Sequence, residues 1–170
     1  YHLRGVLLFG ISEIARSKIC VDYLQANNIT EFGKLMNISH DGDRVYVLAE
    51  DGKYRKSEDI YTDEYLNKLI SDLASEDPAR VLNAQFYMQP GFYGCSTSQI
   101  DQMIDIACSV DGVAGAQLAG AGLGGCIMIL ARKNSIGQLH KALNKNYYKP
   151  NRLSSDIIDC VTTEGAGLVE

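Results

Sequence analysis

The sequence predicts an α+β domain, in which an antiparallel sheet is covered by helices on one face. Apolar residues recur at helical spacing over residues 6–27 and 135–146. Short apolar runs at 114–118 and 126–131, rich in small or β-branched residues, flank a glycine-rich connection and indicate two strands. At 170 residues the chain is long enough for one packed domain and short for two, so we expect residues 1–170 to form a single domain.

The other elements follow from shorter patterns. A second helix is expected to begin at Thr30, and residues 44–48 and 53–55 are typical of a β-hairpin that turns on Asp51-Gly52. Helices over 63–74 and 78–87 are expected next, and then one with Ser96 or Thr97 at its N-cap. Residues 157–162 are predicted to add a last strand to the main sheet.

Composition argues against several classes of protein. The chain is 46% apolar and 22% charged, and its net charge of −5 argues against a nucleic-acid-binding face. An anionic nucleotide is still compatible with this charge, because local backbone amides usually hold phosphate. There is no apolar run of 18 residues, no C-x-x-C pair and no zinc-like spacing of cysteine and histidine. We therefore expect a cytoplasmic protein with reduced cysteines, no membrane segment and no metal site, and the start at Tyr1 suggests a piece of a longer polypeptide.

The glycine-rich connection reads GAGLGG over residues 120–125 and satisfies G-x-G-x-x-G. A dinucleotide site of the Rossmann type needs a helix directly after these glycines and an acid about 20 residues later. Here an apolar strand is expected at 126–131, and residues 144–146 are Asn-Lys-Asn, so that site is disfavoured. Two interpretations stay open: a purely structural hairpin, or a nest of accessible amides for a phosphate or hydroxyl-rich ligand.

Three motifs resemble those of the GHMP kinases, and among them galactokinases most. Residues 112–126 read GVAGAQLAGAGLGGC, which resembles the third motif of that superfamily. Residues 32–40 read FGKLMNISH and residues 95–107 read CSTSQIDQMIDIA, which resemble two galactokinase helices, and the ending EGAG at 164–167 is similar as well. The motifs extend over residues 5–40 and 92–168, so the segment 41–95 is interpreted as an insertion of a hairpin and helices.

The resemblance implies a ferredoxin-like C-terminal domain of an ATP-dependent sugar kinase that forms galactose 1-phosphate and ADP. It implies that Gly120, Ala121, Gly122, Leu123, Gly124 and Gly125 contact the substrate or the transferred phosphoryl group, and that Ser39, His40, Ser96 and Ala119 lie near the substrate. ATP and Mg²⁺ would be bound mostly by an N-terminal catalytic domain, the chain's main partner, which these 170 residues lack. We therefore expect no catalytic residue in this chain and no kinase activity from it alone.

Two residues depart from the pattern of the family's third motif and leave alternative functions open. Gln117 stands where the family usually has Arg or Lys, and Ala119 where it usually has Thr. The full protein is then a sugar kinase, another GHMP kinase acting on a different sugar or a mevalonate-like alcohol, or a non-catalytic sensor of sugar and ATP.

Four aspartates and a histidine are weaker candidates for functional residues. Asp101 and Asp105 lie four apart, which suits acid/base work, although a solvated helix face is the expected interpretation. His40 is expected to be buried and bonded to backbone at a helix end, with a substrate contact as the alternative. Asp41 and Asp43 are a weak hint of Mg²⁺.

Overall fold

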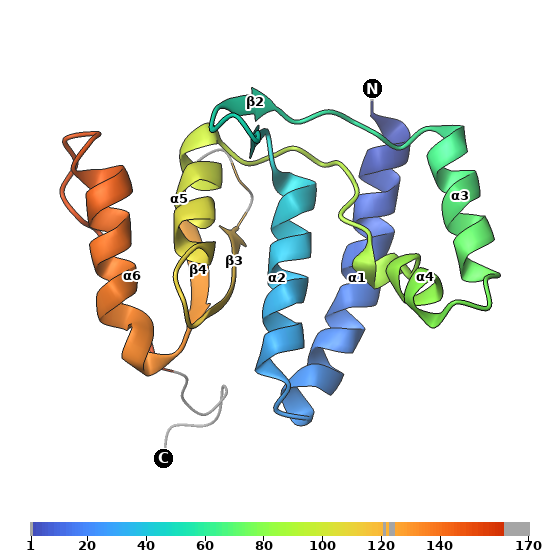
Figure 1. The fold of residues 1–170 in the computed structure, drawn as a ribbon, viewed down its shortest axis with the longest axis horizontal. Helices are drawn as coiled ribbons and strands as arrows, with labels where there is room; N and C mark the ends of the chain where they lie inside the picture. Colours follow the sequence, from blue (N-terminus) through green and yellow to red (C-terminus); the bar gives the residue numbers. More distant parts are fainter. Residues whose placement is uncertain (1, 121, 123–124, 162–170) are drawn as a thin grey trace, which may run out of the picture.

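The computed structural model describes residues 2–120, 122 and 125–161. Its helices are α1 (Leu3–Gln25), α2 (Ile29–Asp43), α3 (Asp63–Leu73), α4 (Pro78–Asn83), α5 (Ser98–Cys108) and α6 (Ile136–Leu143). Its strands are β1 (Tyr46–Leu48), β2 (Tyr54–Lys56), β3 (Val113–Ala119) and β4 (Cys126–Ala131), with short helical turns η1 (Phe86–Met88), η2 (Lys133–Ser135) and η3 (Asn144–Tyr148). Helices thus accompany two small antiparallel sheets, which confirms the α+β class (Figure 1).

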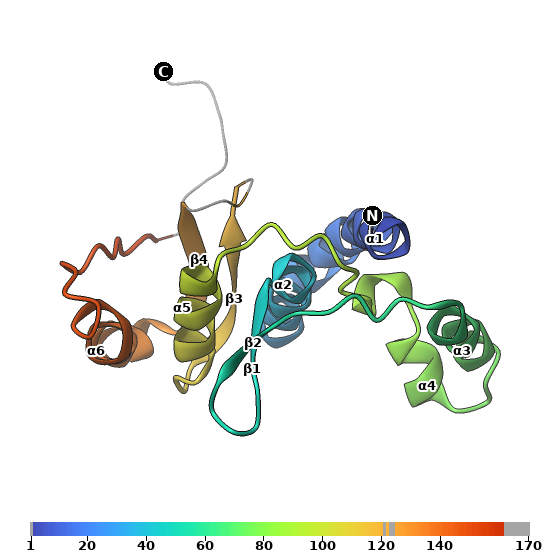
Figure 2. The same cartoon turned by 90° about the horizontal axis from the view of Figure 1, so that it is seen from above.

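The main sheet consists of β3 and β4, paired antiparallel as predicted. Ala116 lies opposite Ile129 and Leu118 opposite Ile127, and these positions face the hydrophobic core. Helix α5 packs on this face and α6 packs beside α5 (Figure 2). The core contains Ile100, Ile104, Ala107, Val110, Ala116, Leu118, Leu139, Leu143, Tyr147 and Tyr148.

Helix α2 lies along the outer edge of β3. A β-carbon on Gly33 would meet the backbone oxygen of Ala114, and one on Gly115 would meet that of Gly33, so glycine at both positions permits the close approach. The side-chain oxygen of Asn37 accepts a hydrogen bond of 2.8 Å from the Ala116 amide. Asn37 therefore takes the place of a neighbouring strand at this edge.

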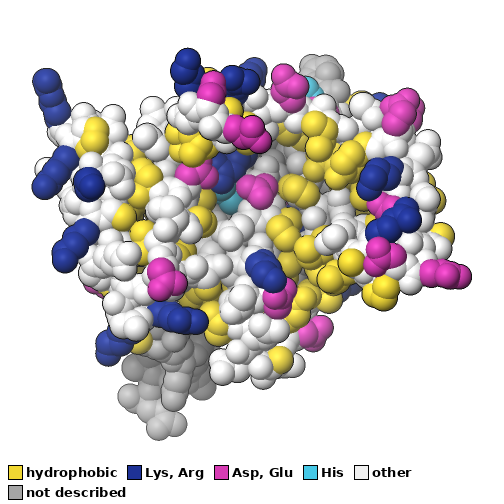
Figure 3. All heavy atoms as spheres, in the orientation of Figure 1, with side chains coloured by type: hydrophobic (Ala, Val, Ile, Leu, Met, Phe, Trp, Pro, Cys, Tyr) yellow, Lys and Arg dark blue, Asp and Glu magenta, His cyan; other side chains and the backbone are white. Residues whose placement is uncertain are grey.

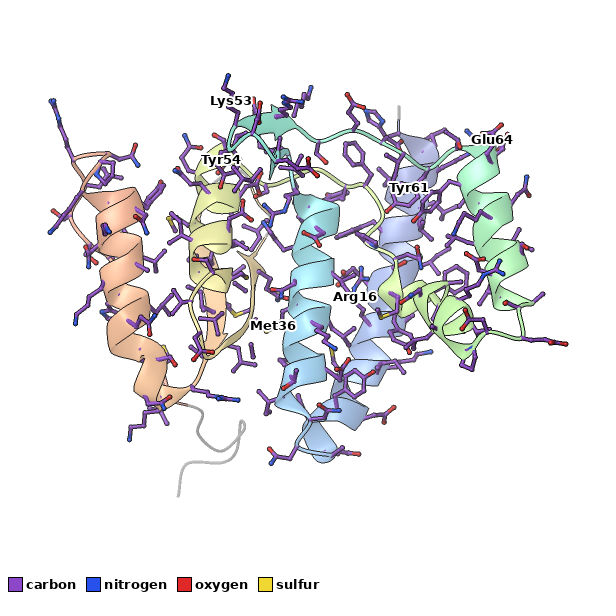
Figure 4. All side chains as sticks on the ribbon, viewed as in Figure 1. Arg16, Met36, Lys53, Tyr54, Tyr61 and Glu64 are labelled. Atoms are coloured by element: carbon purple, nitrogen blue, oxygen red, sulfur yellow. The ribbon has the colours of Figure 1, made fainter. Side chains whose placement is uncertain are left out.

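A buried arginine joins α1 to the segment after α4. The Arg16 side chain is 3% exposed and donates to the carbonyl oxygens of Tyr87 at 3.1 Å and Gln89 at 2.8 Å. Glu13, one helical turn earlier, balances its charge at 2.6 Å. Figure 4 shows Arg16 pointing into the space between α1 and α2. This arginine therefore holds η1 against α1.

Some predicted boundaries were wrong. The N-cap of α2 is Asn28, whose side chain accepts from the Glu31 amide, and not Thr30. The helix expected over 78–87 ends at Asn83, although Pro78 does occupy its first turn. The helix expected over 135–146 continues from α6 into the π-helical turn η3.

The strand predicted over 157–162 is also wrong for residues 157–161, and Thr162 lies outside the described residues. His140 contacts Asp159 at 2.8 Å, and the Tyr148 hydroxyl donates to the carbonyl oxygen of Asp156 at 3.1 Å. These contacts hold the segment on α6 and η3, and Ile157 packs against the core from there.

The surface keeps a substantial apolar share. Hydrophobic side chains gather on the right-hand half of the face in Figure 3, over α1, η1 and α4. Among the residues that the structure describes, no helix is long and apolar enough to cross a membrane.

Candidate functional site

The glycine-rich connection joins β3 directly to β4. Gly120, Gly122 and Gly125 have φ of +87°, +82° and +122°, in the left-handed region that glycine adopts readily. The other three predicted loop residues, Ala121, Leu123 and Gly124, lie outside the described residues. Because β4 begins at Cys126, a strand and not a helix follows the glycines, which excludes the Rossmann arrangement.

Only one described glycine of this connection is confined by a neighbour. A β-carbon on Gly122 would meet the carbonyl oxygen of Cys95, so the loop lies directly against the chain that precedes α5. A β-carbon on Gly120 would meet nothing within 4 Å, and one on Gly125 would meet only the Ala119 oxygen at 3.9 Å. The backbone at Gly120 and Gly125 is therefore open to a ligand.

The residues beneath the loop are fixed by the end of α2. The Cys95 thiol donates to the Asp43 carboxylate at 3.1 Å, and the Ser96 amide donates to the Asp43 carbonyl oxygen at 2.9 Å. Burial and the bond to Asp43 raise the pKa of Cys95 to about 12. Burial also raises the pKa of Asp43, against the lowering effect of the Cys95 bond. The thiol is therefore protonated at neutral pH and is no nucleophile.

A fully buried contact between a histidine and a carboxylate lies next to this segment. His40 Nε2 is 3.2 Å from Asp101 Oδ1, and neither side chain is exposed. Asp101 Oδ2 accepts from the amides of Val45 at 3.1 Å and Tyr46 at 2.8 Å. Burial opposes ionisation of Asp101, but hydrogen bonds from His40, Ser96 and the Tyr46 amide outweigh it and lower its pKa. The pair thus ties α2, α5 and the start of β1 together.

The solvated helix face expected for Asp101 and Asp105 is a wrong prediction. Asp101 is fully buried, because it binds backbone amides of the hairpin strand β1. Asp105 pairs with Arg44 at 2.8 Å and accepts from the Tyr54 hydroxyl at 2.9 Å. Figure 4 shows Tyr54 at the end of α5 where the hairpin crosses it. The two carboxylates anchor the hairpin, and their hydrogen bonds and ion pair within the fold account for both of them.

The remaining predicted residues are distributed unevenly around the loop. Ala119 ends β3 directly before Gly120, and Ser96 follows Cys95, whose carbonyl oxygen lies against Gly122. Ser39 is half-buried on α2 and has no side-chain hydrogen bond within the described part of the chain. His40 is buried as expected, but its contact is the Asp101 side chain and not backbone.

The hint of Mg²⁺ at Asp41 and Asp43 has no support in the geometry. Asp41 pairs with Arg44 at 3.1 Å, whereas Asp43 faces Cys95. Within residues 2–120, 122 and 125–161, no three side chains of His, Cys, Asp or Glu are grouped to hold a metal ion.

Sequence reasoning missed Asp43 and Cys95 as the support of the loop. Their contact joins positions 52 residues apart, and no local pattern marks it. Asp101 had a usable signal, because it lies three residues before the core residue Ile104 and so borders the inner face of α5.

Known proteins similar to this chain are kinases. The family model "GHMP kinases C terminal" matches residues 64–149, just over half of the chain. A galactokinase of Staphylococcus saprophyticus is 32% identical over 101 residues, which cover 59% of this chain and 26% of that protein. Galactokinases of Fusobacterium nucleatum and Staphylococcus carnosus are 23% and 27% identical over 94% and 87% of this chain.

The chain spans only 29% and 38% of the latter two relatives. The family match covers α3 through η3 and includes β3, the glycine-rich connection and β4. The chain therefore belongs to the GHMP kinase family and corresponds to its C-terminal part.

Proposed function

We propose that this chain is the C-terminal domain of an ATP-dependent sugar kinase whose catalytic domain lies on the rest of a longer polypeptide. Family membership and the galactokinase relatives support this proposal. The reaction would transfer the terminal phosphoryl group of ATP to a sugar hydroxyl. Galactose is the first substrate to test, with galactose 1-phosphate and ADP as products.

The observation that carries the proposal is the open glycine-rich connection. All three of its described glycines have positive φ, and Gly120 and Gly125 leave the backbone unobstructed. Phosphoryl transfer depends mainly on positioning and charge stabilisation, which backbone amides can supply. In this proposal the residues 120–125 bind the sugar hydroxyl and the transferred group as the two domains close.

The surrounding residues would act mainly by positioning. Ser96 and Ala119 flank the loop, and a ligand that rests on the loop would lie near them. His40 is fully buried beside Asp101, so it would hold α5 in place and not touch the sugar. Ser39 precedes it on α2, and we keep it as a substrate-proximal candidate.

ATP and Mg²⁺ would be bound chiefly by the other domain. The described residues contain no cluster of carboxylates that could hold Mg²⁺, and the sequence has no Gly-Lys-Ser/Thr phosphate loop. The 170-residue chain is therefore expected to fold without kinase activity. Sugar phosphorylation by the purified chain would contradict this division of roles.

The test is a substrate panel on the full-length polypeptide. Galactose, other hexoses and mevalonate are each incubated with ATP and Mg²⁺, and ADP release and the phosphorylated product are measured. We expect turnover of a sugar, with galactose preferred. Turnover of mevalonate alone would replace the sugar kinase with another GHMP kinase.

A second candidate is a sensor that binds sugar and ATP without turnover. The observation that favours it is Ala119, which brings no hydroxyl to the end of β3 where the loop begins. Calorimetry on the full-length polypeptide separates the two functions. Binding of sugar and ATP without ADP release would support the sensor.

A further inference from the structure

Helix α1 carries exposed apolar residues on the side opposite its buried face. The face that packs on η1 and α2 buries Gly5, Ser12 and Arg16 along with Leu8. The outward face carries a row of large apolar side chains that we call the outer stripe: Leu3, Leu7, Ile14, Val21 and Leu24, which are 74%, 65%, 62%, 51% and 50% exposed. Their spacing of three, four or seven residues places them along one side of the helix.

A glycine in the middle of this stripe has no local explanation. Gly10 lies between Leu7 and Ile14 on the same side, and a β-carbon there would meet nothing within 4 Å. Glycine in a helix interior is less favourable than alanine. Gly5, by contrast, is confined by Phe92 at 2.6 Å. Gly10 therefore suits a close approach by a surface outside the described residues.

The exposed apolar side of α1 suggests that the helix packs against a further surface. The buried side is explained by the bonds from Arg16 to the carbonyl oxygens near η1. A helix with one buried side and a row of large apolar residues on the opposite side is expected to be covered by protein on both sides. The outer stripe runs from Leu3 to Leu24, almost the full length of the 23-residue helix, so its occupant must be an extended surface.

We infer that the outer stripe of α1 is the docking surface for the N-terminal domain of the same polypeptide. This inference rests on the two-domain arrangement proposed above. The family match is to the C-terminal part, and the chain spans 26% to 38% of the relatives described. Most of a galactokinase-length polypeptide thus lies outside these residues and can supply an apolar surface of this length.

The test compares the same substitutions in two contexts. The double variant Leu7→Gln, Ile14→Gln is prepared in the full-length polypeptide and in the 170-residue chain, and the melting temperature of each is measured. We expect a fall of several degrees in the full-length polypeptide and about 1 °C or less in the 170-residue chain, where both side chains face water. Ile70→Gln on α3 is the matched control, since Ile70 is 64% exposed and lies off the stripe.

For Gly10→Ala we expect melting-temperature changes of opposite sign in the 170-residue chain and in the full-length polypeptide. Alanine should raise the melting temperature of the 170-residue chain through its helix propensity, and lower it in the full-length polypeptide, where a β-carbon would separate the two surfaces. Equal effects of all variants in both contexts would overturn the inference. So would a dimer of the 170-residue chain that Leu7→Gln, Ile14→Gln dissociates, because a second copy would then be the occupant. These melting temperatures need no substrate, so the docking surface can hold even where the sugar kinase assay fails.

Discussion

The hairpins β1–β2 and β3–β4 are both antiparallel pairs, but they are anchored by different means. The strands of β1–β2 are largely exposed, with Leu48 at 52%, and side chains of α5 hold them. In β3–β4 the side chains of Ala116 and Leu118 lie in the core, at 0% and 6% exposure. A strand pair with little apolar burial thus depends on charged anchors, whereas one held by the core can carry a loop without large side chains.

The turns of the two hairpins sharpen this comparison. Gly52 in β1–β2 has φ of +76° and Gly120 after β3 has φ of +87°, and a β-carbon on either would meet nothing within 4 Å. Their local geometry is therefore alike. Only the second is expected to serve a ligand.

The largest expected effect is on the anchor of the first hairpin. Asp101→Ala removes the partner of His40 and leaves the amides of Val45 and Tyr46 unpaired. Each buried polar group that is left without a partner costs about 1–3 kcal/mol, so the total loss should be several kcal/mol. Urea unfolding of the 170-residue chain should show this loss. Asp41→Ala is the control, because Asp41 is half-exposed and Arg44 keeps its pair with Asp105, so the loss should be about 1 kcal/mol or less.

The next effect tests the loop of the second hairpin. Gly120→Ala and Gly52→Ala each place a side chain at positive φ and should cost similar stability, about 1 kcal/mol. In the full-length polypeptide, only Gly120→Ala should also lower sugar kinase turnover, by about tenfold to a hundredfold where a backbone donor is displaced. Steady-state kinetics and melting curves on both variants decide this. Equal turnover of the two variants would make the loop a scaffold only.

The sequence was sufficient to predict the strands β3 and β4 and the helices α1 and α2. The strands and α2 bury apolar residues at a spacing that the element itself sets, so the pattern is local. In α1 the spacing predicts the helix but not its buried side, because Leu7, Ile14 and Leu24 are exposed. The positive φ of Gly120, Gly122 and Gly125 explains why glycine occupies these positions. Contact of these residues with a ligand stays a prediction.

The remaining features depend on contacts between distant segments. Asp101 borders the inner face of α5, but its burial depends on the hairpin, 55 residues earlier, whose amide groups it binds. The strand expected at 157–162 has a suitable pattern, but bonds from His140 and Tyr148 hold residues 157–161 elsewhere. A local pattern shows which face of an element is apolar and does not show what packs there.

Two carboxylates near the loop should give stability a characteristic pH dependence. The pKa of Asp43 is raised, so acidification from neutral pH to the ordinary value near 4 should stabilise the fold. The pKa of Asp101 is lowered, so its contribution is present above about pH 4 and is lost as pH falls through its folded pKa.

The measurement is the free energy of unfolding of the 170-residue chain between about pH 7 and pH 3. Asp43→Asn should abolish the gain on acidification and keep the loss below about pH 4. A monotonic fall from neutral pH in the unsubstituted chain would contradict the role of Asp43. Other carboxylates with lowered pKa, such as Asp72, add to the acid loss and do not produce the gain.

The smallest expected loss of stability concerns the second anchor of the first hairpin, the bond from Tyr54 to Asp105. Tyr54→Phe removes the hydroxyl that donates to Asp105, but Asp105 keeps its 2.8 Å pair with Arg44, so no charge is left unpaired. The loss should be about 0.5–1.5 kcal/mol. Tyr46→Phe is the matched control, because the Tyr46 hydroxyl has no hydrogen bond within the described residues. Amide exchange localises the effect: Ala49 and Ser57, whose amides bond across the β1–β2 hairpin, should exchange faster in Tyr54→Phe, whereas the Gln117 amide, on the side of β3 that faces β4, should not change. Faster exchange at Gln117 as well would mean that the two hairpins open together, and the contrast between their anchors would then fail.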